Sequence, residues 1–337
     1  MRPIKNTYET YSPKVIKNLG YLINPFLLNF KSERNRLLVF YFHGLYESMK
    51  QKQLHHVDPQ NNMTTKQFID FIEYFLHYKY KFIIPKDLSS ELKENQSYAM
   101  ITFDDGYFNN MLAVEILKRY NIPAVFFITT NNVKQNISYW WDIIYKFRVK
   151  QGINLETIRN EQRTLKSVKF SAINDYITQN FGIKAFEPWS DIDRPFNEVE
   201  VRDLAENPYV SIGNHTHNHS ILTCYTRDEI KQELSESSNI LFNLTGKYPV
   251  SVAFPNGNYN DMVIEVTEEA GFKYAFTTEP KKNPLPAEDT KLIRIDRYHP
   301  NTTEIARYGS FFRLGYEPEY LADDLKIKIK SILRRRK

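Results

Sequence analysis

Two clusters of side chains in this sequence could carry out hydrolysis together. Asp104 and Asp105 are adjacent and follow an apolar run, and His215, His217 and His219 lie within five residues of one another, about 110 positions further on. One carboxylate and two imidazoles can hold a divalent metal and leave coordination positions open, while the second carboxylate serves as a base. That combination is what a metal-assisted attack of water on an amide or ester requires.

The sequence around these residues favours a buried metal site over a solvated turn. An Asp-Asp-Gly sequence is by itself typical of a turn, but here it ends a run too apolar for a surface loop. Two adjacent carboxylates at a buried strand end repel each other unless a positive charge lies close by. His215 and His219 are four residues apart and can share one side of a compact turn. We expect these two histidines to be the ligands, and pairs that include His217 are the alternative.

Apolar runs alternate with amphipathic stretches at the spacing of βα units, which favours a parallel sheet or barrel. The carboxyl ends of parallel strands meet at one edge, where such folds place their chemistry. His43, the two aspartates and the histidine cluster all follow predicted strands, so we expect them to meet. The sequence predicts strands at 37–43, 80–84, 97–103, 124–128, 209–212, 251–254, 274–277 and 292–295, and helices at about 64–76, 109–119, 198–206, 227–244 and 261–270.

Residues 131–195 do not continue this alternation of strand and helix patterns. They contain the adjacent Trp140 and Trp141, followed by a polar stretch with a helical pattern. We interpret the segment as a helical insertion packed on the barrel near its mouth. The expected organisation is a basic N-terminal extension (1–36), a main domain that includes the insertion (37–310), and a basic amphipathic tail (311–337).

The charge is concentrated at the two ends of the chain. The net charge is +5, but residues 1–36 carry +5 and residues 326–337 carry +7, so the residues between them carry −7. An acidic body does not fit a basic nucleic-acid groove, and we expect no nucleic-acid partner. The single Cys224 cannot form an internal disulfide and is interpreted as structural.

The sequence predicts a cytoplasmic protein. No run approaches the ~20 apolar residues of a membrane span, and the first residues lack the pattern of a secretion signal. In the tail, Leu321, Leu325 and Ile329 recur at helical spacing with cations between them. This pattern suits peripheral contact with an anionic membrane, and the alternative is a solvated terminal helix packed on the barrel.

Several motifs resemble those of the polysaccharide deacetylases, the NodB-type carbohydrate esterases. The resemblance covers about residues 37–300 and implies a deformed (β/α) barrel. It also implies hydrolytic removal of acetyl groups from a carbohydrate. Its parts are TFDDG at 102–106 (first motif), PAVFF at 123–127 (the strand that follows), HTHNHSIL at 215–222 (second motif), FPNG at 254–257 (third motif) and RIDR at 294–297, where a fourth is expected.

The resemblance also implies roles for individual residues. Asp105, His215 and His219 would bind the metal, for which Zn²⁺ is the best fit, and Asp104 would be the general base. Leu222 would line the pocket for the acetyl methyl group. The walls of the groove would come from Pro255, Asn256 and Gly257. Independently of the family, aromatic rings suit sugar faces, and the candidates for stacking are Trp140, Trp141 and Tyr259.

The sequence departs from the family pattern in two places. Many members carry an arginine in the third motif that orients the base, but residues 252–255 contain none; Arg294 or Arg297 could supply that charge. The C-terminal motif of the family contains a histidine that acts as general acid, but no histidine follows His299. The poly-N-acetylglucosamine deacetylases carry this histidine on an early strand, and the sequence YFHG at 41–44 resembles that arrangement. We therefore favour His43 as the acid, with His299 as the alternative.

The sequence thus predicts a metal-dependent hydrolase that removes N-acetyl groups from a sugar or polysaccharide. The expected substrate is an envelope polysaccharide or a lipid-linked or nucleotide-linked intermediate of glycan biosynthesis. The alternatives are an O-acetyl sugar esterase, a non-catalytic carbohydrate-binding relative and a metal-dependent phosphoesterase. The oligomeric state is left open.

Overall fold

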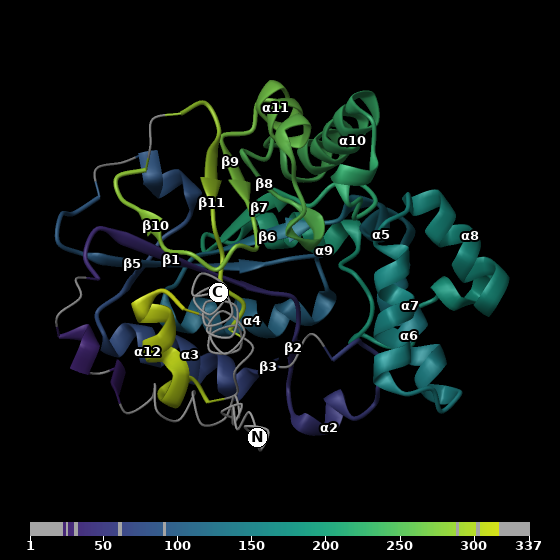
Figure 1. Cartoon of the computed structure of the whole chain (residues 1–337), viewed down its shortest axis with the longest axis horizontal. Coiled ribbons are helices and arrows are strands. Elements are labelled where there is room, and N and C mark those ends of the chain that lie inside the picture. Colours follow the sequence, from purple (N-terminus) through teal and green to yellow (C-terminus); the bar gives the residue numbers. More distant parts are fainter. Residues whose placement is uncertain are drawn as a thin grey trace, which may run out of the picture.

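A nine-stranded sheet forms the centre of the protein, and helices pack around it (Figure 1). The computed structural model describes residues 23–24, 26–29, 33–59, 63–89, 92–287, 290–300 and 304–316. The strand order is β10-β1-β5-β6-β7-β8-β9-β11, and β4 pairs with β5. The strands of this sheet are β1 (Arg36–Phe42), β4 (Lys81–Phe82), β5 (Ser97–Phe103), β6 (Ala124–Ile128), β7 (Val210–Asn214), β8 (Ser251–Ala253), β9 (Tyr274–Phe276), β10 (Asn283–Pro284) and β11 (Ile293–Ile295).

The sheet closes on itself almost completely. Neighbouring strands from β1 to β11 pair in parallel, whereas β10 pairs with β1 in the antiparallel sense. Beyond β11 the chain returns to β1, where Tyr298 forms a parallel bridge with Phe40. The Tyr41 amide donates to the Tyr298 carbonyl (3.0 Å), and the Tyr298 amide donates to the Val39 carbonyl (2.8 Å). The predicted deformed (β/α) barrel is therefore confirmed.

The helices around the barrel agree closely with the sequence pattern. The first of them, α3, begins after Thr64, whose side chain forms a capping box with Gln67. The apolar residues of α3 face the core, except Leu76 near its end, which is 40% exposed. A second, two-stranded sheet pairs β2 (Leu45–Tyr46) with β3 (Met63–Thr64). The helices outside the insertion are α2 (Met49–Lys52), α3 (Thr65–His77), α4 (Met111–Tyr120), α9 (Glu198–Glu206), α10 (Arg227–Thr245), α11 (Asp261–Glu269) and α12 (Ile305–Leu314).

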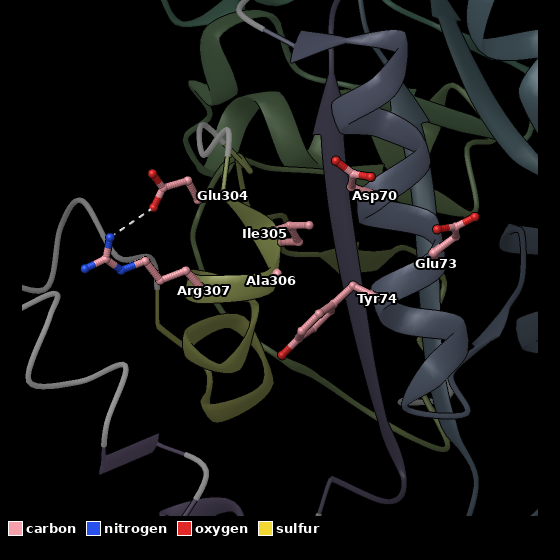
Figure 2. A pocket seen from close by; sticks show the side chains of 7 residues that line it. All are labelled: Asp70, Glu73, Tyr74, Glu304, Ile305, Ala306 and Arg307. Carbon is pink, nitrogen blue, oxygen red and sulfur yellow. Dashed lines mark hydrogen bonds and ion pairs between the residues drawn. The ribbon is translucent and has the colours of Figure 1, made fainter.

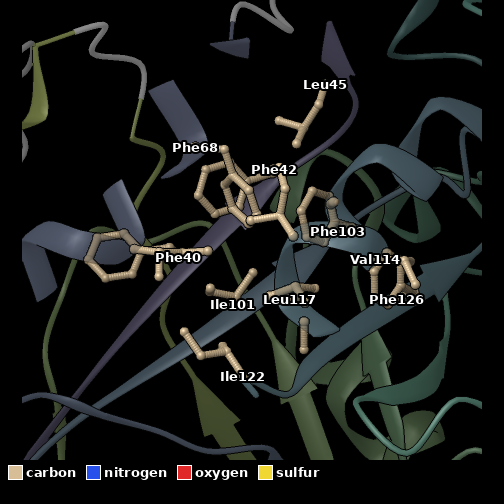
Figure 3. Close-up of a cluster of buried hydrophobic side chains, with 14 of the residues drawn as sticks. Phe40, Phe42, Leu45, Phe68, Ile101, Phe103, Val114, Leu117, Ile122 and Phe126 are labelled. Atoms are coloured by element: carbon tan, nitrogen blue, oxygen red, sulfur yellow. The ribbon is translucent and has the colours of Figure 1, made fainter. Parts of the chain in front are cut away.

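The largest hydrophobic core lies between the sheet and helices α3 and α4. Phe42 and Phe103 stack across β1 and β5, and Phe68 of α3 packs against both rings (Figure 3). Phe103 also stacks on Phe126 of β6. The central strands are buried on both faces, which explains why their sequences are continuous apolar runs instead of alternating patterns. This packing holds in place the strand ends that carry the candidate site residues.

The insertion forms a helical layer at one side of the barrel, in teal in Figure 1. Its helices are α5 (Thr130–Gln135), α6 (Trp140–Lys150), α7 (Leu155–Leu165) and α8 (Phe170–Phe181). They share a hydrophobic cluster that includes Trp141, Ile144 and Ile158, and this cluster reaches Tyr107, which follows β5. The insertion is therefore packed directly beside the end of the strand that carries the two aspartates.

Residues near the two predicted domain boundaries contact each other. Arg313, at the end of α12, donates to both carboxylate oxygens of Glu33 (2.9 and 2.6 Å), and its guanidinium lies over the ring of Tyr78. The boundary predicted at residue 310 falls inside α12, whose Phe312 packs on Phe40 of the barrel. The cationic tail with Leu321, Leu325 and Ile329 lies outside the described residues. Among the described residues, no helix is both long and apolar enough to cross a bilayer.

A buried ion pair holds the insertion together. Lys146 of α6 contacts Asp193 at 2.7 Å, and both side chains are fully buried. Lys146 also donates to Ser138 (3.1 Å), and Asp193 accepts the backbone amides of Trp189 and Ser190. Removing one member would leave the other charge buried without its partner.

We expect Lys146→Met to lower the free energy of unfolding by about 3 kcal/mol, because Asp193 would keep an uncompensated buried charge. The matched control is Lys66→Met, which breaks the exposed pair with Asp70 and should cost less than about 1 kcal/mol. Urea denaturation of the three proteins measures both values. Equal losses of unfolding free energy in the two variants would contradict a stabilising role of the buried Lys146–Asp193 pair.

Candidate metal centre and active site

The structure brings three side chains together at the carboxyl edge of the barrel. Asp105 follows β5, and His215 and His219 follow β7. The Nε2 atoms of both histidines lie 3.3 Å from Oδ1 of Asp105. One ligand atom from each residue lies within 4.8 Å of the others; Asp105 and His215 are buried, and His219 is 13% exposed. This is the arrangement that a single divalent cation with one oxygen and two nitrogen ligands needs.

The backbone near the ligands adopts left-handed conformations. The φ angles are +73° at Asp105, +63° at Thr216 and +52° at His219. Such values are uncommon outside glycine, and for a β-branched threonine they indicate strain that the surroundings must hold. The side chain of Asn214 accepts the Thr216 amide (2.7 Å), and the Thr216 hydroxyl accepts the Ser220 amide (2.9 Å). These bonds keep the turn in the shape that aims both histidines at Asp105.

The hydrogen bonds of the ligands leave their coordinating atoms available. Nδ1 of His215 lies 2.8 Å from the Ala253 carbonyl, which accepts its proton and leaves Nε2 free to face Asp105. Both carboxylate oxygens of Asp105 are buried, and no described residue donates a hydrogen bond to them. Buried carboxylate oxygens without donors are rare in folded proteins and are explained where an ion binds. The donor set therefore fits a divalent metal.

His217 points away from this centre. Its Nδ1 lies 2.9 Å from the Thr130 hydroxyl, and its Nε2 lies 3.2 Å from a carboxylate oxygen of Glu236. Its backbone amide donates to Glu233 of α10. The fold therefore does not assemble a metal site from His217 with either His215 or His219.

Asp104 is held by a buried arginine. Arg297 is fully buried and donates to both carboxylate oxygens of Asp104, at 2.7 and 2.8 Å. It also donates to the Thr102 hydroxyl (3.1 Å) and the Thr277 carbonyl (2.8 Å). Of the two arginines considered from the sequence, Arg297 is thus the one that reaches the aspartate. Arg294 lies over the ring of Tyr259 instead.

Burial by itself would raise the pKa of both aspartates. The pKa of Asp104 is nevertheless lowered, because the Arg297 guanidinium and His215 outweigh the effect of burial. The pKa of Asp105 is also lowered, by the two ligand histidines beside its carboxylate. Both carboxylates are therefore ionised at neutral pH, as a base and a metal ligand must be.

The two candidate acids occupy different environments. His43 lines the same cavity as Asp105, and its Nδ1 is buried without a hydrogen-bond partner among the described residues. His299 stacks on Tyr41, with ring centroids 4.8 Å apart. Burial, together with the nearby His43, lowers the pKa of His299 to about 3, so that this imidazole is neutral at pH 7. The arrangement therefore favours His43 as the proton donor.

The insertion is tied to the metal ligands by hydrogen bonds. The hydroxyl of Tyr139 donates to the backbone carbonyl of Asp105 (3.0 Å), and Trp141 Nε1 donates to the Tyr107 hydroxyl (2.9 Å). That hydroxyl donates in turn to the buried carboxyl of Asp142 (2.6 Å). The ring of Trp141 packs on His219, with centroids 4.5 Å apart. Trp141 thus supports a ligand at the same time as it lines the cavity.

The cavity at the metal centre has a volume of about 80 Å³. It includes Trp140, Trp141 and Asn256, as the sequence suggested. Three other lining residues were not predicted from the sequence: Gln162, Lys166 and Ile221. Gln162 and Lys166 are four residues apart at the end of α7, and Ile221 immediately precedes the predicted Leu222. The complete lining is His43, Asp105, Trp140, Trp141, Gln162, Lys166, His219, Ile221 and Asn256.

The other predicted substrate contacts lie behind the cavity wall or beside it. Leu222 is fully buried in a cluster with α10 and α11, so that Ile221 takes the lining position. Pro255 is buried, and Gly257 has a φ of +72°. A Cβ atom at Gly257 would meet the Thr278 hydroxyl at 1.9 Å, so only glycine fits there. Tyr259 donates to Glu279 and does not line this cavity.

A second hollow, between α3 and α12, contains no metal ligand set in the part of the chain that the structure describes. Figure 2 shows its acidic residues Asp70, Glu73 and Glu304, with Glu304 paired to Arg307 at 3.3 Å. Asp70 pairs with Lys66, and Glu73 accepts the Tyr120 hydroxyl. Each of these carboxylates already has an ion-pair or hydrogen-bond partner, so the catalytic candidate is the cavity at the barrel edge.

The barrel sequence matches one protein family. The family model described as Polysaccharide deacetylase matches residues 91–275, which is more than half of the 337-residue chain. The chain is 21% identical over 220 residues to YxkH of Bacillus subtilis (strain 168), whose name assigns it to the polysaccharide deacetylases. That match covers 64% of this chain and 58% of YxkH, so the chain spans little more than half of its curated relative.

Solved structures share the fold. A polysaccharide deacetylase from Bacillus cereus superposes with a TM-score of 0.55 at 17% identity, covering 82% of this chain and 69% of that one. A de-N-acetylase from Aggregatibacter actinomycetemcomitans superposes with a TM-score of 0.53 at 17% identity, covering 79% and 96%. The barrel, the Asp-His-His cluster and the sequence match over more than half of the chain agree, and this protein belongs to the polysaccharide deacetylase family.

Proposed function

We propose that this protein is a metal-dependent hydrolase that removes N-acetyl groups from a sugar or glycan. The observation that carries the proposal is the pairing of two aspartates with different roles at one strand end. Asp105 faces His215 and His219, whereas Asp104 is held by Arg297 in a separate ion pair. Carbohydrate binding alone would need neither a metal ligand set nor a second, ionised carboxylate beside it.

Asp105, His215 and His219 would hold the ion, and a mixed oxygen and nitrogen set of three protein ligands favours Zn²⁺. An ion bound there would lower the pKa of a water molecule and polarise the acetyl carbonyl. Asp104 then accepts the proton of the attacking water, with one lone pair on each carboxylate oxygen engaged by Arg297. The bidentate contact fixes the orientation of the base without protonating it.

Amide cleavage also needs a proton donor, because an amine leaves poorly as an anion. His43 lines the cavity beside Asp105 and has no internal partner for its Nδ1 among the described residues. We assign the protonation of the departing nitrogen to His43. An O-acetyl ester, whose alkoxide is a better leaving group, would depend less on this residue.

Two rival functions are less well supported by the site. A phosphoesterase with two metals would need further ligands, but the described residues contain one cluster of three. A non-catalytic relative would not need a second, ionised carboxylate beside the metal ligands. We further propose that the substrate is an envelope polysaccharide or a lipid-linked intermediate of glycan biosynthesis, and that the protein acts in the cytoplasm or at the inner face of the membrane.

Metal binding is expected to depend on the three ligands and not on His217. Asp105→Asn and His215→Gln should each abolish stoichiometric binding of Zn²⁺, because two remaining ligands cannot complete the site. His217→Gln is the matched control from the same turn and should retain one equivalent. Elemental analysis after dialysis measures the metal content. Loss of metal in the control alone would overturn the ligand assignment.

The base assignment predicts a separation of metal binding from activity. Asp104→Asn should keep one equivalent of metal and lower kcat for acetate release by about 10²-fold or more, the usual effect of removing a general base. Asp70→Asn, a surface substitution, should leave the rate unchanged. Acetate release from N-acetylated oligosaccharides and lipid-linked sugars measures the rate. A full rate in Asp104→Asn would refute the proposed mechanism.

The acid assignment predicts a dependence on the leaving group. His43→Asn should lower the rate on N-acetyl substrates about 10²-fold or more, but should affect O-acetyl esters less. His299→Asn is the control, because His299 does not line the cavity. The ratio of the two rates is measured for each variant. An equal loss on both substrates in His43→Asn would argue that His43 does not protonate the leaving group.

A further inference from the structure

Lys166 lies at the cavity without a carboxylate partner. It caps the C-terminal end of α7 in the insertion and lines the same cavity as the ligands Asp105 and His219. Its ammonium group donates to the side-chain oxygen of Asn256 at 2.6 Å. Among the described residues no carboxylate lies within ion-pair distance of it, and an ammonium group has three hydrogens to donate. Two of its donors are therefore left over at the mouth of the site.

Three other cations of the insertion are paired with acids. Arg148 contacts Glu161 (2.9 Å), Lys146 contacts Asp193 (2.7 Å) and Lys169 contacts Glu229 (2.5 Å). Lys166 is partly buried, and burial lowers its pKa although Asp58 and Asp105 act in the opposite direction. A partly buried charge without a direct ion-pair partner loses hydration that no contact replaces. Folding stability does not explain why a lysine is placed there.

The charges around the cavity favour an anion. Arg297 compensates the charge of Asp104, so Asp58 and Asp105 are the negative charges that act on Lys166. A divalent cation in the site would balance these two carboxylates, and Lys166 would make the potential at the cavity positive. Charges that line a narrow, partly enclosed cleft act more strongly than exposed ones.

The size of the cavity determines what part of the substrate meets Lys166. Its volume is about 80 Å³, far below the roughly 300–1,000 Å³ of pockets that enclose whole ligands. The acetamido group can enter, while the sugar ring and its other substituents stay at the mouth. Lys166 and Asn256 connect the insertion to the loop after β8 at this place. A group on the same sugar, or on the linkage beside it, is therefore within reach of the ammonium.

We propose that Lys166 determines specificity by binding an anionic group, a phosphate or a carboxylate, next to the N-acetyl group of the substrate. The inference rests on the proposed function, because it concerns the substrate of the same metal site. It narrows the substrate class from acetylated sugars in general to acidic or phosphate-linked ones. A sugar phosphate, a sugar joined to a carrier through phosphate and an aminouronic acid share this chemistry.

The test compares three substrates of the zinc-loaded enzyme. They are N-acetylglucosamine 1-phosphate, the methyl glycoside of an N-acetylated aminouronic acid, and neutral methyl N-acetylglucosaminide. The variants are Lys166→Met and, as a matched control, Lys169→Met, which removes the same charge from the insertion outside the cavity. Acetate release gives kcat and KM separately. Calorimetry with the same compounds and Asp104→Asn protein gives binding without turnover.

Lys166→Met should raise KM for the preferred anionic substrate about tenfold or more, since a hydrogen bond to a charged group is lost. Its kcat, and its KM for the neutral glycoside, should stay within about twofold, a change of less than ~0.5 kcal/mol. Lys169→Met should behave like the wild type. The anionic compound whose KM rises most shows whether Lys166 binds a phosphate or a carboxylate. The same loss of affinity should appear in calorimetry when Lys166→Met is added to Asp104→Asn.

Two results would overturn the inference. Equal affinity for anionic and neutral compounds, unchanged by Lys166→Met, would exclude an anion site although acetate release would still uphold the proposed function. A fall in kcat for all three substrates with unchanged KM would make Lys166 part of the catalytic step instead. Conversely, Lys166-dependent binding of the anionic compound without acetate release from any substrate would uphold the anion site and refute the proposed hydrolysis.

Discussion

The buried ion pair between Arg297 and Asp104 depends on closure of the barrel. Arg297 lies just before Tyr298, whose bridge to Phe40 brings the end of the last strand against the first. A fully buried guanidinium needs acceptors for its donors, and here the aspartate, a threonine hydroxyl and a backbone carbonyl accept four of its five N–H groups. The contact that orients the proposed base is therefore also a contact that joins the two ends of the sheet.

The metal ligands depend on a second set of contacts, which the insertion provides. Tyr139 binds the backbone of Asp105, and Trp141 packs on His219 while its indole nitrogen donates to Tyr107. Burial raises the pKa of Asp142, which accepts the Tyr107 hydroxyl at the end of this series of hydrogen bonds. Although residues 131–195 interrupt the βα pattern, they stabilise the strained turn at the strand end.

Chemistry and selectivity thus come from different parts of the chain. The barrel strands supply the aspartates, the histidines and Arg297 from their carboxyl ends, where the parallel arrangement gathers them. The insertion supplies Trp140, Trp141, Gln162 and Lys166 to the cavity wall. A barrel can keep its reaction while an insertion changes the groups that meet the rest of the substrate. Lys166 is the clearest example, because it is the unpaired cation among the residues that line this cavity.

The sequence by itself determined the elements and the ligand set of this protein. Continuous apolar runs and helical periodicity predicted β5 and β6 with their observed bounds, and the local motifs around Asp105 and His215 predicted the metal cluster, because these signals span only a few neighbouring residues. Arg297 was one of two candidates until the structure placed it against Asp104, 193 residues away. No sequence pattern marks Lys166 and Gln162 as cavity residues, because a polar helix face has the same pattern whether it contacts solvent or lines a cavity. Tertiary structure decided these contacts because they depend on how distant segments close around one edge of the barrel, which no local pattern encodes.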